Sequence, residues 1–118
     1  MISCVAPGSD DGGLSWSPPE PTGIGGYPAH LCPLPDGRIL CTYAVRHGLR
    51  AILAVTSGDE GRSWDAGDAL VVRGDLPDKD LGYPCTLALS GGWMLSVYYA
   101  RDETGTTCIQ ATGWTLPA

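Results

Sequence analysis

Residues 9–16 read SDDGGLSW and residues 57–64 read SGDEGRSW, so the pattern S-x-D-x-G-x-S-W occurs twice, 48 positions apart. Sequence repeats of this period are typical of folds that stack one supersecondary unit on the next. Because runs of aliphatic and β-branched residues accompany the copies, the repeated unit is predicted to consist of strands rather than helices. The motif therefore constrains the fold and the size of its unit together.

Each copy has the composition of a hairpin turn. The Asp can accept backbone N–H bonds from residues two positions on, and the Gly two positions later adopts a positive φ at low steric cost. The second Ser can bond locally, and the Trp is expected to bury its ring against neighbouring strands while its indole N–H meets a carbonyl. A calcium loop would need more oxygen ligands and a closing Glu. We therefore favour a scaffold role over a calcium-binding or ligand-contacting role for Ser9, Asp11, Gly13, Trp16, Ser57, Asp59, Gly61 and Trp64.

A second repeat starts at the GYP tripeptides of residues 26–28 and 82–84. An apolar run, a Gly-containing turn and a second apolar run with Tyr and Arg at its end follow each tripeptide. This pattern predicts the last two strands of one unit in residues 1–25, a complete four-stranded unit in residues 26–75 and three strands in residues 76–118. No segment has the apolar period and the caps of a helix, so almost no helix is expected.

The S-x-D-x-G-x-S-W motifs resemble the Asp-box (BNR) repeats of the sialidase superfamily, whose members are six-bladed β-propellers. The resemblance extends over residues 26–46, 50–64 and 80–118, and the last stretch is similar to the carboxyl-terminal end of bacterial sialidase-like proteins. It implies that residues 1–118 form one all-β, partial propeller domain with four-stranded antiparallel blades. Closed propellers have about four to eight blades, whereas this chain supplies about two. Either further blades or other copies of the chain are needed to close the ring.

Composition excludes some partners. The net charge of −6 and the pI of about 4.5 argue against nucleic acid or an anionic membrane surface. No signal peptide or transmembrane segment is visible, which predicts a cytoplasmic protein if Met1 is the native start. The five cysteines form no metal-binding pattern and are expected to be free, buried residues rather than disulfides. No metal or cofactor is indicated.

Propeller topology would put the GYP loops and the Arg-containing turns together on one rim, opposite the S-x-D-x-G-x-S-W turns. The residues expected on this rim are Tyr27, His30, Arg46, His47, Arg50, Tyr83, Tyr99, Arg101, Asp102 and Glu103. Among them, Tyr27 and His30 are candidates for substrate binding. A histidine could also serve as acid or base, or be a hydrogen-bonded structural residue.

The resemblance implies a tyrosine nucleophile and a set of arginines that bind the carboxylate of sialic acid. A neutral phenol suits this substrate because the substrate carboxylate would repel an anionic nucleophile. Tyr83 matches the nucleophile's position, with Pro84 in place of the usual Ser; the alternative is a buried structural tyrosine. Arg50 matches one of the arginines best and Arg46 is the alternate, since a planar guanidinium binds carboxylate bidentately. Either arginine could instead form a rim salt bridge.

The resemblance implies a glycoside hydrolase that releases a terminal sialic acid or a related acidic sugar. The family's general acid, its other arginines and the carboxylate that activates the tyrosine lie in earlier blades, which this chain does not match. The 118 residues alone are therefore expected to be inactive. The alternatives are a sugar-binding lectin whose short chains assemble into a ring, and a non-catalytic propeller scaffold.

Overall fold

The computed structural model describes residues 4–117, and these form an all-β structure of three antiparallel sheets. The first sheet has two strands, the second has four in the order β3-β4-β5-β6, and the third has three in the order β7-β8-β9. Short 3-10 turns occur at η1 (Ala66–Asp68) and η2 (Ser90–Gly92). The strands are β1 (Val5–Ala6), β2 (Glu20–Pro21), β3 (Ala29–Pro33), β4 (Ile39–Val45), β5 (Ala51–Ser57), β6 (Leu70–Arg73), β7 (Leu81–Ala88), β8 (Trp93–Arg101) and β9 (Thr107–Thr115).

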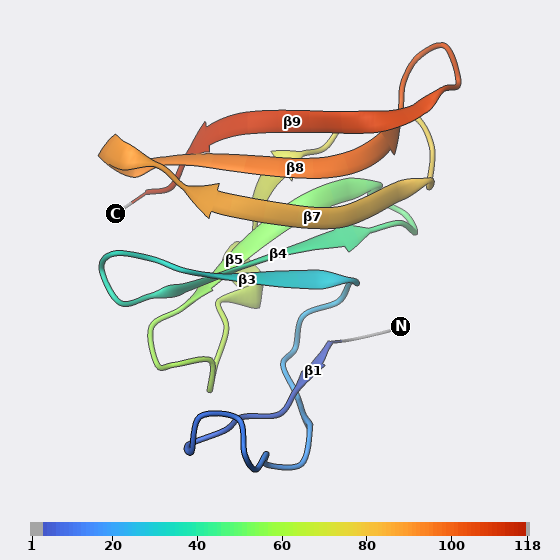
Figure 1. Ribbon diagram of the computed structural model, residues 1–118. Coiled ribbons are helices and arrows are strands. Elements are labelled where there is room, and N and C mark those ends of the chain that lie inside the picture. The colour runs from blue at the N-terminus through green and yellow to red at the C-terminus, as the bar shows by residue number, and fades with distance from the viewer. Residues whose placement is uncertain (1–3, 118) are drawn as a thin grey trace.

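The sheets follow one another in space in the order of the sequence (Figure 1). The β1–β2 ribbon lies at one end of the molecule, the four-stranded sheet in the middle and the three-stranded sheet at the other end. The expectation of an all-β, antiparallel chain with almost no helix is confirmed. Across residues 4–117 the sheets do not close into a ring. None of the helical turns in this part of the chain is long and apolar enough to cross a membrane.

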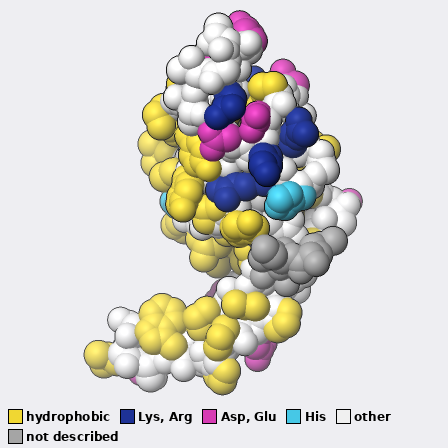
Figure 2. Space-filling view, turned by 90° about the vertical axis from the view of Figure 1, so that its right-hand side faces the viewer, with side chains coloured by type: hydrophobic (Ala, Val, Ile, Leu, Met, Phe, Trp, Pro, Cys, Tyr) yellow, Lys and Arg dark blue, Asp and Glu magenta, His cyan; other side chains and the backbone are white. Residues whose placement is uncertain are grey.

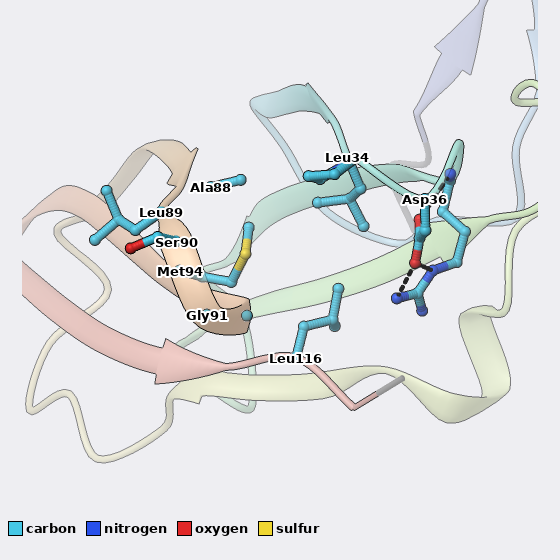
Figure 3. Close-up of a pocket in the computed structure, with 11 residues that line it drawn as sticks. Leu34, Asp36, Ala88, Leu89, Ser90, Gly91, Met94 and Leu116 are labelled. Atoms are coloured by element: carbon cyan, nitrogen blue, oxygen red, sulfur yellow. Dashed lines mark hydrogen bonds and ion pairs between the residues drawn. The ribbon is translucent and has the colours of Figure 1, made fainter.

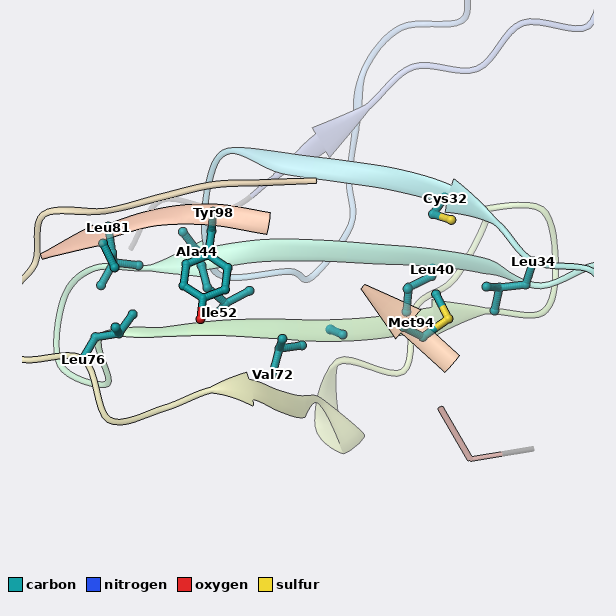
Figure 4. Packing of buried hydrophobic residues seen from close by; sticks show 12 residues of the cluster. Cys32, Leu34, Leu40, Ala44, Ile52, Val72, Leu76, Leu81, Met94 and Tyr98 are labelled. Carbon is teal, nitrogen blue, oxygen red and sulfur yellow. The ribbon is translucent and has the colours of Figure 1, made fainter. Parts of the chain in front are cut away.

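Strand β4 is buried on both faces because a separate apolar cluster covers each of them. Leu40 and Ala44 belong to the cluster between the four-stranded and three-stranded sheets, which also holds Ile52, Leu81 and Tyr98 (Figure 4). On the opposite face, a smaller cluster consists of Ile24, Cys41, Tyr43 and Val55. This explains why ILCTYAV reads as a nearly continuous apolar run, as strands buried on both faces do.

The S-x-D-x-G-x-S-W motifs join antiparallel strands, one between β1 and β2 and the other between β5 and β6. In the second copy, Ser57 Oγ accepts the Gly61 N–H at 2.8 Å and donates to Asp59 at 2.7 Å. The Asp59 carboxylate accepts both the Ser63 N–H and the Ser63 hydroxyl. Glu60 and Gly61 both have positive φ, 63° and 84°. The expected hairpin turn is therefore present, as a ring of local hydrogen bonds around one carboxylate.

Three details of the turn differ from expectation. The Asp accepts from the residue four positions on, not two, because the first Ser hydroxyl takes the nearer N–H groups. Trp64 packs against the smaller cluster, but its buried indole N–H has no hydrogen-bond partner among the described residues, where a carbonyl was expected. Trp16 is 62% exposed, and its indole N–H returns to the Gly13 carbonyl of its own turn. The prediction of a buried ring was wrong for Trp16 because the two-stranded β1–β2 ribbon has no further strand to cover it.

All five cysteines are free thiols, as expected. Cys32 and Cys41 are buried, and burial raises the pKa of Cys41 to about 12. Cys85, in contrast, is exposed, which corrects the expectation that every cysteine is a buried hydrophobic residue. The alternation along β7 turns its side chain outward with those of Tyr83 and Leu87.

The Asp59 turn predicts a specific loss of stability in acid. Hydrogen bonds from the Ser63 hydroxyl, the Ser63 N–H and the Ser57 hydroxyl lower the pKa of Asp59 from 3.8 to about 2. Because the folded chain has the lower pKa, the carboxylate stabilises it fully above 3.8, and this contribution disappears as the pH falls toward about 2. Asp59→Asn should lower the melting temperature at neutral pH, with a deficit that shrinks at the acidic end of this range. Thermal melts followed by circular dichroism at several pH values will measure this difference in melting temperature.

Asp65→Asn is the matched control, because Asp65 follows the same turn and its side chain makes no capping hydrogen bond. This variant should melt like the parent chain throughout. If the melting temperature of Asp59→Asn is lower than that of the parent chain by the same amount at every pH, the ionised carboxylate is not what stabilises the turn.

Candidate functional site

The β4–β5 loop, the start of β7 and the β8–β9 turn lie at the same end of the two larger sheets. The registers place the β4–β5 loop at one end of the first sheet, and the start of β7 and the β8–β9 turn together at one end of the second. The hydrogen bond from Arg46 to the Leu81 carbonyl brings these two ends together. The S-x-D-x-G-x-S-W turn of residues 57–64 leaves β5 at the opposite end, where Ser57 pairs with Ile39. Figure 2 shows basic side chains gathered with acidic ones and a histidine on the upper part of the face toward the viewer.

Arg46 and three tyrosines form a cluster at this end. The Arg46 guanidinium carbon lies 5.2 Å from the centre of the Tyr27 ring and 6.0 Å from that of Tyr83. Arg46 Nε donates to the Leu81 carbonyl at 2.7 Å, and Nη2 donates to the Tyr99 hydroxyl at 3.2 Å. The Tyr83 and Tyr99 ring centres are 5.9 Å apart. The tyrosines of the two GYP tripeptides thus meet at one arginine, and cation–π attraction favours the charged group there.

The glycines of the two GYP tripeptides allow close approach of this arginine and its strand. A Cβ at Gly26 would lie 2.5 Å from the Ala44 carbonyl oxygen, which accepts the Tyr27 N–H at 3.0 Å. A Cβ at Gly82, whose φ is 149°, would lie 2.6 Å from Arg46 Nη2. Side chains at these positions would displace Tyr27 or Arg46, so the glycines are needed for the cluster.

A bulge in β7 directs Tyr83 outward. The register with β8 shifts between Gly82 and Cys85, so neither Tyr83 nor Pro84 has a paired residue. Tyr83 has a φ of 50°, rare for a bulky residue, and is 69% exposed. A proline is tolerated here because a bulged position needs no ladder N–H. Strained residues in bulges occur often at functional sites, and the exposure of Tyr83 disagrees with the buried structural alternative.

Arg46 differs from the other half-buried arginines in its partners. Arg38 pairs with Asp36 at 2.8 Å, Arg73 pairs with Asp75, and Arg101 contacts two further carboxylates at 3.6 and 3.7 Å. Among the side chains that the structure describes, no carboxylate forms an ion pair with Arg46. Its Nη1 also makes no hydrogen bond within residues 4–117. The cluster therefore offers a positive charge and free donors to an anion.

The structure gives the two candidate arginines different surroundings. Arg50, the preferred candidate, is exposed, has a φ of 51° and donates to the Pro77 carbonyl at 2.8 Å. The alternate, Arg46, joins Tyr83. The reason is the tight loop after β4, which turns residue 50 toward the segment before β7 while Arg46 stays in line with its strand.

The other expected rim residues have separate partners. His30 contacts Cys85 and Thr86, and no described contact joins it to Arg46. Arg101 is bound to Asp78 and Asp80. Asp102 accepts hydrogen bonds from Thr104 and Thr106, which lower its pKa, so its carboxylate anchors the β8–β9 turn. The exposed His47 and Glu103 make no side-chain hydrogen bond or ion pair within the described part of the chain.

Tyr99 was expected on the rim, but its direct contact with Arg46 was not foreseen. The Leu81 carbonyl, a backbone acceptor, was missed altogether. The recurrence of Tyr before an Arg at the end of the second apolar run was the signal for Tyr99. No sequence pattern could have indicated the carbonyl, because the β7 bulge and the docking of the two sheets create that contact.

A concavity lies at the opposite end of the two larger sheets. This pocket of about 430 Å³ is formed by the β3–β4 and β7–β8 turns, with Met94 and Leu116 on its walls (Figure 3). Its two charged side chains, Asp36 and Arg38, are bonded to each other. We therefore assign the candidate site to the Arg46–tyrosine cluster, where the charge has no such partner. No group of three or more potential metal ligands occurs within residues 4–117.

Comparisons with known proteins give one structural neighbour to report. A crystal structure of a protein of unknown function from Dyadobacter fermentans DSM 18053 superposes with a TM-score of 0.79 and 32% sequence identity. The alignment covers 92% of this chain and 30% of that protein, so the chain spans under a third of the neighbour's length. No family model and no curated protein matches the sequence.

The positive φ of Tyr83 predicts that glycine is more stabilising than alanine at this position, the reverse of the usual order in a strand. Tyr83→Gly should be more stable than Tyr83→Ala by about 1 kcal/mol, because only glycine adopts this conformation without strain. At Leu87, an exposed position of the same strand, the order should reverse, since glycine normally costs roughly 0.5–1 kcal/mol relative to alanine. Urea denaturation of the four variants measures both differences. If the alanine variant is the more stable one at both positions, residue 83 is unstrained.

Proposed function

We propose that this chain is the carboxyl-terminal portion of a sialidase-like glycoside hydrolase. In this proposal, Arg46 receives the carboxylate of a terminal acidic sugar and Tyr83 is the nucleophile. One observation carries the proposal: Arg46 is half-buried among tyrosines and, within residues 4–117, has no carboxylate partner of the kind that the other half-buried arginines have. A partly desolvated charge without a counter-ion is costly, so a ligand anion would stabilise it.

The unused donors of Arg46 fit a carboxylate. Nε and Nη2 already bond to protein oxygens, which fixes the plane of the guanidinium. The free Nη1 and the remaining Nη2 hydrogen can both point at an anion, and charge-assisted bonds of this kind are strong. Tyr83 lies beside this position as a neutral, exposed phenol. A neutral nucleophile approaches an anomeric carbon that bears a carboxylate with less repulsion than an Asp or Glu would meet.

The propeller arrangement is part of the proposal. Its support is the succession of three sheets in chain order, with the Asp-box turn of the four-stranded sheet at the end away from Arg46. Strand β9 has no outer partner among the described strands, and alternate residues along it are exposed. An unpaired edge of this kind would accept a fourth strand from elsewhere in a closed ring.

A binding protein is the second candidate. The described contacts of Arg46 and Tyr83 include no carboxylate, so the cluster could hold an acidic sugar without cleaving it. In that case several copies of this short chain would assemble into a ring lectin. Sedimentation analysis separates the candidates, because a discrete trimer favours the lectin and self-association without a defined size favours a portion of a longer propeller.

Binding of N-acetylneuraminic acid tests the role of Arg46. Arg46→Ala should weaken binding at least about tenfold, since a hydrogen bond to a charged group contributes about 1.5–3 kcal/mol. Arg38→Ala is the matched control, because Arg38 is also half-buried but lies at the opposite end of the sheets and is paired with Asp36. Binding is measured by NMR titration. Equal affinity for the sugar and its uncharged methyl ester would overturn the proposal.

Turnover by the isolated chain is expected to be absent. The family's general acid and its remaining arginines have no counterpart here, and the one acidic residue of the nearby turn that accepts multiple bonds, Asp102, is structural. Incubation of the purified chain with a chromogenic sialoside should therefore release no aglycone above a protein-free blank. Saturable release would show that these residues contain a complete catalytic site.

A further inference from the structure

His30 bridges the first strands, β3 and β7, of the two larger sheets. It lies on β3, and its ring reaches the free edge of β7, the strand that pairs only with β8 among the described strands. The Thr86 N–H donates to His30 Nδ1 at 3.2 Å, and His30 Nε2 lies 3.5 Å from the sulfur of Cys85. The histidine thus covers an unpaired strand edge and contacts a thiol at the same time.

The Thr86 contact decides which ring nitrogen carries the proton. Because a backbone N–H can only donate, Nδ1 must be the acceptor, and the neutral ring then has its hydrogen on Nε2. The Nε2–H therefore faces the Cys85 sulfur. A hydrogen bond donated to sulfur favours the thiolate, which is the nucleophilic form of cysteine.

The other thiols have different environments. Cys4 and Cys32 each donate to a backbone carbonyl. Cys108 donates to the Ala100 carbonyl and accepts an amide N–H of Gln110, both at 3.7 Å, but it is half-buried, whereas Cys85 is exposed. Cys41 is buried, and desolvation raises its pKa to about 12. Cys85 is the exposed cysteine of the five and the one whose sulfur faces a ring N–H.

We propose that Cys85 is a reactive thiol that takes small carbon electrophiles, with His30 as its positioning residue. In the reaction the Cys85 sulfur attacks the electrophilic carbon, a C–S bond forms, the bond to the leaving group breaks, and the thiol proton goes to solvent. Because Tyr83 and Cys85 are both exposed along β7, the added group would lie beside the candidate site. The inference is independent of the proposed hydrolase function.

Iodoacetamide is a suitable probe because it is small, uncharged and loses only iodide. Brief labelling of the full chain at neutral pH, followed by peptide mass spectrometry, gives a rate for each cysteine. Cys85 should react about tenfold faster than Cys4, whose thiol donates to a carbonyl, and faster than the same residue in urea-denatured chain.

Two substitutions at His30 distinguish its role as a hydrogen-bond donor to Cys85 from its role as an acceptor for the Thr86 N–H. His30→Asn keeps an acceptor at the Nδ1 position for the Thr86 N–H but removes the donor near sulfur, so the Cys85 rate should fall about tenfold. His30→Gln places an amide N–H near the Nε2 position and should restore much of the rate. An unchanged rate in His30→Asn, a rate in His30→Gln no higher than in His30→Asn, or no preference for Cys85 in the parent chain would overturn the proposal.

Discussion

The docking of the four-stranded sheet against the three-stranded sheet is the constraint on which the rest of the structure depends. A chain of hydrogen bonds crosses this interface from the Trp114 indole through Ser96 and Thr86 to Thr42, at 2.9, 2.8 and 3.1 Å. The three hydroxyl residues are at most 4% exposed and lie beside the apolar cluster. Buried hydroxyls cost free energy unless they are paired, so the sheets fit together in one register. That register brings the Leu81 carbonyl to Arg46.

The two ends of the sheets use charged side chains in different ways. At one end, the Asp59 carboxylate accepts hydrogen bonds from donors of its own turn, and these bonds stabilise the hairpin. At the other end, Arg46 has aromatic neighbours, and the described residues give it no acid. A charge satisfied by its own loop stabilises the fold, whereas a charge left without a counter-ion is available to a ligand. This contrast is the physical basis for placing the candidate site at the Arg46 end.

Local patterns in the sequence predicted much of this arrangement. The hairpin at residues 57–64 follows from one Asp, one Gly and two Ser whose bonds are all within the turn. The strands follow from apolar runs between Gly-containing turns. The prediction for Trp16 was wrong because burial depends on a neighbouring strand, and no described strand covers the β1–β2 ribbon there. The position of the Arg46 and Arg50 guanidinium groups did not follow from spacing, because loop geometry decides where a guanidinium points.

The sequence by itself determined the all-β class, the two hairpin turns and the tyrosines and arginines available at one end, because turn chemistry and strand periodicity act over a few residues. Only the tertiary structure decided that Arg46 meets Tyr27, Tyr83 and Tyr99, and that His30 meets Cys85. These contacts join residues from different strands. They form only when one sheet docks on the other and a bulge in β7 turns a side chain outward.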